Sequence, residues 1–115
     1  MEYLILIYNN AETAAAIEGP DKEENDRAHR EVQEELTASG ELIETQILDD
    51  REARVVRTGG EVLVTAGPYA EVAEWVGGYY RVDCADLDRA TAIASRFVEA
   101  RRSPVEVRRI GLSEA

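Results

Sequence analysis

His29, the single histidine of this sequence, is the residue best suited to proton transfer. It lies three residues before Val32 and seven before Leu36, at the border of the apolar stripe that a helix through these residues would turn toward a sheet. Imidazole is the side chain that most readily takes or gives a proton near neutral pH. The alternative is a structural histidine, hydrogen-bonded across the junction of helix and sheet. No partner for the imidazole is evident, which favours the structural role.

The tripeptide Gly67-Pro68-Tyr69 is a second candidate, for ligand binding. Glycine lets a ligand approach the backbone, proline fixes the direction of the chain, and tyrosine offers both a ring and a hydroxyl group. The alternative is a turn whose Tyr69 packs into a neighbouring subunit. The sequence leaves both interpretations open.

Tyr79 and Arg108 form a third candidate site. In an extended strand Tyr79 shares one face with Arg81 and Asp83. If that face lines a cleft, Tyr79 and Arg108 would form a pocket for a small organic anion, because a guanidinium group can hold a carboxylate through two hydrogen bonds. An ion pair between Arg108 and a glutamate is the alternative, and the abundance of acidic residues favours it.

The charge balance excludes several partners. The chain carries 24 acidic and 13 basic side chains, a net charge of −11, so we expect no nucleic-acid or membrane binding.

The acidic run from Glu18 to Asp26 lacks calcium-loop spacing, and the lone Cys84 cannot complete a zinc site with one histidine, so we expect no metal. The sequence contains no phosphate-loop or dinucleotide motif, so no cofactor is expected. The start of the chain lacks the features of a signal peptide, which predicts a cytoplasmic protein.

Apolar periodicity and turn residues predict one α+β domain over residues 1–115. The expected strands are 3–8, 42–48, 79–84 and 105–110, with a hairpin of 53–57 and 61–65 and helices at 22–39 and 86–100. Both helices would cover the same face of the sheet, yet the strands are apolar or aromatic on both faces. A second copy of the chain packed on the free face is therefore expected, which predicts a homodimer.

Five short segments, taken in their order and spacing, resemble the YCII-related family, and more narrowly its DGPF-domain branch. They are Tyr3–Tyr8, Thr65–Glu71, Gly77–Tyr80, Ala85–Asp88 and Val105–Arg108. The resemblance implies a ferredoxin-like domain of the βαββαβ type that pairs into a dimeric α/β barrel. It also implies that His29 matches the helix on which relatives place their histidine. Some members of the DGPF branch are associated with sigma factors, which implies a sigma factor as a further partner.

The sequence departs from the branch motif at Ala66, where the motif has Asp, and at Tyr69, where it has Phe. Three functions remain open. The first is a small dimeric binding or regulatory module with a cleft for a small organic molecule. The second is a lyase or isomerase that uses His29 for proton transfer and Arg108 or Tyr69 to stabilise an anionic intermediate. The third is a sigma-factor-associated protein in transcription. The missing Asp and the unpartnered histidine favour the first.

Overall fold

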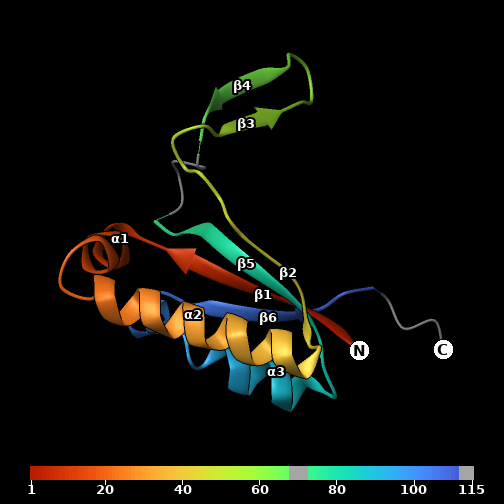
Figure 1. Cartoon of the computed structure of the whole chain (residues 1–115). Coiled ribbons are helices and arrows are strands. Elements are labelled where there is room, and N and C mark those ends of the chain that lie inside the picture. Colours follow the sequence, from red (N-terminus) through yellow and green to blue (C-terminus); the bar gives the residue numbers. More distant parts are fainter. Residues whose placement is uncertain (68–72, 112–115) are drawn as a thin grey trace.

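The structure, a computed structural model, describes residues 1–67 and 73–111 (Figure 1). It contains the strands β1 (Glu2–Asn9), β2 (Leu42–Ile47), β3 (Arg54–Arg57), β4 (Leu63–Ala66), β5 (Trp75–Asp83) and β6 (Val105–Arg109). It also contains the helices α1 (Ala11–Glu18), α2 (Lys22–Ser39) and α3 (Leu87–Ala94), and the 3-10 turn η1 (Val98–Arg101).

Four strands form an antiparallel sheet in the order β2-β5-β1-β6, and the helices lie on one of its faces (Figure 1). Alternate residues of β1 are buried against α2, which contributes Val32 and Leu36, both fully buried. This confirms the expected helical stripe and agrees with a ferredoxin-like α+β fold.

The end of α2 follows from one glycine. Gly40 adopts φ of 79°, and its N–H donates to the carbonyl groups of Leu36 and Thr37. Glycine takes this left-handed conformation without a Cβ clash, so the helix ends there, as the sequence predicts.

The last helix is shorter than expected. The sequence predicts one helix over 86–100, but α3 ends at Ala94, and the chain re-forms one 3-10 turn, η1, after an extended Phe97. In an uninterrupted α-helix, residue 99 would lie about 140° around the axis from residue 94 and face away from the core. The break instead directs Glu99 inward, where it is 6% exposed. Leu87, expected in the buried stripe, is 54% exposed.

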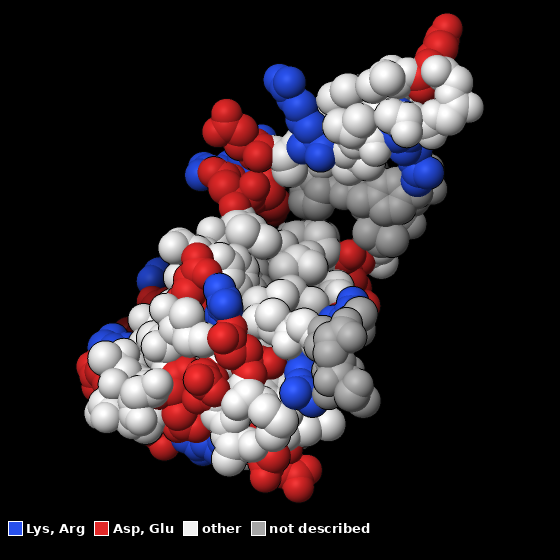
Figure 2. Space-filling model, turned by 90° about the vertical axis from the view of Figure 1, so that its right-hand side faces the viewer, with Lys and Arg blue, Asp and Glu red and all other residues white. Residues whose placement is uncertain are grey.

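The predicted hairpin is present and projects away from the sheet (Figure 1). Its turn uses positive φ at Gly59 and Gly60, and its exposed apolar side chains are Val56, Val62, Leu63 and Val64. The radius of gyration is 15.8 Å, above the about 13 Å of a compact chain of this length. In Figure 2 the hairpin is a largely uncharged arm at the top, while acidic side chains spread over the body of the protein.

The face of the sheet opposite the helices carries Leu4, Leu6 and Tyr8 from β1 and Tyr79 from β5. The strands are thus apolar or aromatic on both faces, as predicted. Among the described helices, none combines the length and the hydropathy needed to cross a bilayer.

Candidate functional site

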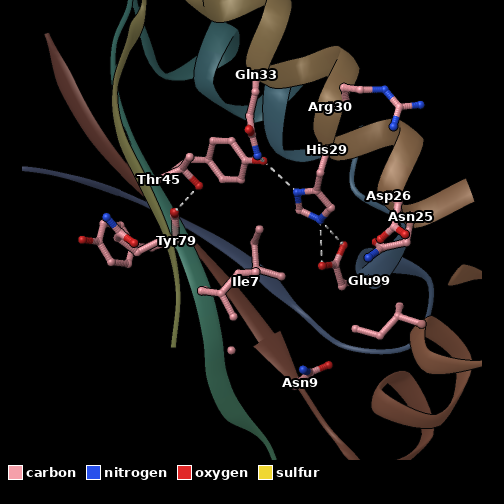
Figure 3. Close-up of a pocket in the computed structure, with 16 residues that line it drawn as sticks. Ile7, Asn9, Asn25, Asp26, His29, Arg30, Gln33, Thr45, Tyr79 and Glu99 are labelled. Atoms are coloured by element: carbon pink, nitrogen blue, oxygen red, sulfur yellow. Dashed lines mark hydrogen bonds and ion pairs between the residues drawn. The ribbon is translucent and has the colours of Figure 1, made fainter. Parts of the chain in front are cut away.

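A cavity of about 380 Å³ lies between α2 and the β2–β5 edge of the sheet (Figure 3). His29 and Gln33 of α2, Tyr80 of β5 and Glu99 of η1 form one side of it. This volume lies within the range of cavities that bind small organic molecules.

The imidazole of His29 is hydrogen-bonded at both nitrogens. Its Nε2 lies 2.9 and 3.1 Å from the two carboxylate oxygens of Glu99, and its Nδ1 lies 2.7 Å from the hydroxyl oxygen of Tyr80. Because an ionised carboxylate only accepts hydrogen bonds, Nε2 carries a proton, and Nδ1 of the neutral ring accepts the proton of the phenol. The ring stacks on Phe97 with centroids 4.8 Å apart, which fixes its plane.

Tyr80 continues the network on the far side of His29. Its side chain is 2% exposed, and its hydroxyl oxygen accepts a hydrogen bond of 3.0 Å from Nε2 of Gln33. Burial raises the pKa of the Tyr80 phenol, while the hydrogen bond from Gln33 acts in the opposite direction. The phenol therefore stays protonated at neutral pH.

Glu99 is the residue beside His29 that the sequence analysis missed. Helical periodicity places it on the outer face, and only the break before η1 turns it toward His29. One local signal points to it: Glu99 is the charged residue within the apolar run Phe97-Val98-Glu99-Ala100. Charged side chains are seldom buried without a partner, so this pattern predicts a polar or charged partner for Glu99.

His29 itself lies where the sequence predicts, at the border of the buried stripe, with a side chain 21% exposed. It bridges helix and sheet through Tyr80, as the structural interpretation requires. It also has the carboxylate partner that the sequence analysis did not find.

The other predicted site residues lie elsewhere. Tyr79 borders the cavity, but its side chain lies on the opposite face of the sheet. There its hydroxyl group donates to Glu44 at 2.8 Å, and this hydrogen bond raises the pKa of Tyr79. Arg108 is exposed on β6, opposite Leu4, and β1 separates its strand from that of Tyr79. The structure describes no contact between the Tyr79 and Arg108 side chains.

The predicted loop site is described only at its first residue. Gly67 lies at the base of the hairpin, where its N–H donates to the carbonyl of Ala53 at 2.7 Å. It is not among the described residues that line the cavity. Pro68 and Tyr69 lie outside the described residues.

Two residues of the acidic run pair with arginines, and Cys84 is buried. Asp21 and Glu24 accept from Arg102 and Arg101, each at 2.6 Å. Within residues 1–67 and 73–111, no three potential metal ligands lie grouped together. Cys84 is 6% exposed, and burial raises the pKa of its thiol, which agrees with the predicted role of a small apolar side chain.

Comparison with known proteins identifies the family. The YCII-related domain matches residues 1–111. An uncharacterized protein of Rhizobium meliloti (strain 1021) is 33% identical over 119 residues, an alignment that covers 97% of this chain and 94% of that protein. The resemblance of the five short segments therefore holds over nearly the entire chain, and the protein belongs to the YCII-related family.

Proposed function

We propose that this protein is a proton-transfer enzyme of the lyase or isomerase type that acts on a small organic molecule in the cavity. The observation that supports this proposal is the position of His29 at the cavity wall, between a buried carboxylate and a buried phenol. A histidine oriented by a carboxylate is a common arrangement for general acid–base catalysis.

In this proposal, the proton reaches His29 through Tyr80. The Tyr80 oxygen takes a proton from the ligand while its own proton moves to Nδ1 of His29, and Glu99 stabilises the resulting imidazolium ion through Nε2. Because burial raises the pKa of Tyr80, the two transfers are concerted and no free phenolate forms. The reverse sequence returns the proton to another atom of the ligand, as an isomerase requires.

Deuterium exchange tests this function without knowledge of the natural substrate. Small ketones, lactones and hydroxylated rings that bind the protein are identified first by ligand-observed NMR. The bound compounds are then incubated in D₂O with the parent protein and with His29→Gln and Glu99→Gln. We expect the parent to exchange carbon-bound protons of at least one compound, and both variants to lose most of that exchange. Compounds that bind equally well to all three proteins and never exchange would contradict the proposal.

A binding or regulatory module is the second candidate function. It is supported by the completeness of the network, since protein groups already occupy both nitrogens of His29 and the Tyr80 side chain is 2% exposed. In that case ligands bind without exchange, and the His29→Gln variant retains their affinity.

We further propose that the protein is a homodimer. The free face of the sheet carries Leu4, Leu6 and Tyr8, and the hairpin adds four exposed apolar side chains. Apolar surface of this kind is characteristic of an interface with another chain. A second copy packed sheet to sheet would give the dimeric α/β barrel that the family resemblance implies.

A further inference from the structure

Gln33 of α2 ends the chain of hydrogen bonds that begins at Glu99 (Figure 3). The residue is half-buried at the border of the cavity, and its Nε2 lies 3.0 Å from the hydroxyl oxygen of Tyr80. In the part of the chain that the structure describes, His29 and Gln33 are the two side chains that hydrogen-bond to this hydroxyl group. The direction of these two hydrogen bonds therefore decides where the single phenol proton lies.

Both directions follow from the carboxylate at the other end. Because Glu99 only accepts hydrogen bonds, Nε2 of the neutral His29 ring carries the proton and Nδ1 is an acceptor. The Tyr80 hydroxyl group, 2.7 Å away, donates its one proton to Nδ1. The Tyr80 oxygen then offers lone pairs only, so Gln33 reaches it with an amide N–H. A hydrogen-bond acceptor in the place of that N–H would compete with Nδ1 for the phenol proton.

The same N–H stabilises negative charge on the Tyr80 oxygen. While the phenol proton moves to Nδ1 and before the ligand proton is fully bound, this oxygen carries partial negative charge, which a fixed donor in a site away from water stabilises. The Tyr80 side chain is 2% exposed, and the hydrogen bond from Gln33 lowers the pKa of its phenol, against the effect of burial. The amide of Gln33 thus favours the transfer as well as directing it.

We infer that Gln33 is a positioning residue, which directs the Tyr80 proton to Nδ1 of His29 and stabilises the Tyr80 oxygen as that proton leaves. Gln33 acts through Tyr80 and needs no contact with the ligand. The inference rests on the proposed function for the movement of the proton, but the hydrogen bonds that carry it can be observed without a substrate.

Two variants separate the direction of the hydrogen bond from packing. Gln33→Glu keeps the shape but presents only acceptors at about pH 8, where an ordinary carboxyl group is ionised, so the Tyr80 proton should turn to the new carboxylate. Nδ1 of His29 then loses its hydrogen bond or takes up a proton itself, and its ¹⁵N signal should move by as much as in Tyr80→Phe. Gln33→Leu offers no acceptor, so the phenol can still donate to Nδ1 and the shift should be clearly smaller. A packing role predicts the opposite order, because Leu is the less conservative change.

Two controls isolate the path through the phenol. Thr37→Glu adds the same charge at an exposed position about one turn further along α2 and should leave the Nδ1 signal unchanged. In the Tyr80→Phe background, which has no phenol proton, Gln33→Glu should have little further effect on Nδ1. The ¹³Cζ titration of Tyr80 is an independent measurement: Gln33→Leu removes the donor and should raise the pKa of the Tyr80 phenol further. This titration decides the question alone if Gln33→Glu does not fold.

The outcomes distinguish this inference from the proposed function. An Nδ1 signal that Gln33→Glu leaves unchanged, an equal or larger shift in Gln33→Leu, or a Tyr80 titration that Gln33→Leu does not move would overturn the inference, whatever the deuterium exchange shows. If the spectra change as expected but no bound compound exchanges protons with the parent protein, Gln33 directs the Tyr80 proton and the enzyme proposal fails. If the parent does exchange, Gln33→Glu should lose as much of that exchange as Tyr80→Phe.

Discussion

The carboxylate of Glu99 is the buried charged partner of the His29 imidazole. Its carboxylate is buried and accepts from Nε2 of His29, so removal of the imidazole leaves a buried charge without its partner. We expect His29→Ala to lower the free energy of unfolding by about 2 kcal/mol, above the about 1 kcal/mol of one net hydrogen bond. In His29→Ala/Glu99→Gln, which has no buried charge, part of this loss should be recovered. Urea denaturation of the parent, His29→Ala, Glu99→Gln and the double variant measures both effects.

The contrary outcome is a double variant that is less stable than His29→Ala by as much as Glu99→Gln alone destabilises the parent protein. The two residues would then contribute independently, and Glu99 would not be the partner of the imidazole.

A second pair predicts a pH dependence of stability. Arg89 donates to the two carboxylate oxygens of Glu41 at 2.9 and 3.0 Å, and these hydrogen bonds lower the pKa of Glu41 below its usual range. A carboxyl group whose pKa is lower in the folded state stabilises the fold above its unfolded pKa, and this contribution is lost as the pH falls through the folded pKa. Glu41→Gln should therefore lower the free energy of unfolding by about 1 kcal/mol at neutral pH and by much less near about pH 3. Urea denaturation at both pH values measures this, and a pH-independent difference would show that the pair does not act through charge.

At the level of helices and strands, the capping glycine of α2 can be tested alone. No atom lies within 4 Å of the position that a Cβ on Gly40 would take, so a substitution there meets only the penalty of positive φ. Gly40→Ala should lower the free energy of unfolding by about 1 kcal/mol. Thr37→Ala, exposed in the last turn, is the control. Equal stability of Gly40→Ala and the parent would mean that the helix end relaxes and that Gly40 is not required there.

The sequence predicts those elements whose apolar residues all face one core. The stripe of Val32 and Leu36 and the alternation in β1 follow directly from helical and strand periodicity, and both are present. The break between α3 and η1 could not be predicted in this way, because the extended Phe97 resets the helical phase without a change in apolar content. The buried position of Glu99 beside His29 depends on that break. His29 could be found from its position in the stripe, whereas Glu99 could not.

At the scale of the whole chain, no described element covers two of the apolar surfaces. The free face of the sheet and the projecting hairpin would both be buried in the proposed homodimer. We expect sedimentation velocity at micromolar concentration to give about twice the 12.8 kDa of one chain. A folded species at the mass of one chain would contradict the dimer.

The contribution of the hairpin to the proposed dimer interface can be separated from that of the sheet. Leu63→Lys places a charge among the exposed apolar side chains of the hairpin and should weaken the dimer if these side chains lie in the interface. Glu61→Lys changes the charge of the same hairpin outside its apolar cluster and is the control. A dimer unaffected by Leu63→Lys would restrict the interface to the sheet.

The imidazole ¹⁵N spectrum tests the proposed Glu99–His29–Tyr80 network most directly. His29 is the only histidine, so its ring nitrogens can be assigned without ambiguity. For the neutral ring, the geometry predicts one tautomer, with the proton on Nε2 facing Glu99 and Nδ1 accepting from Tyr80. Glu99→Gln should shift the Nε2 signal, and Tyr80→Phe should shift that of Nδ1. Averaged signals from two exchanging tautomers that neither substitution alters would contradict the network and, with it, the proton path proposed for this protein.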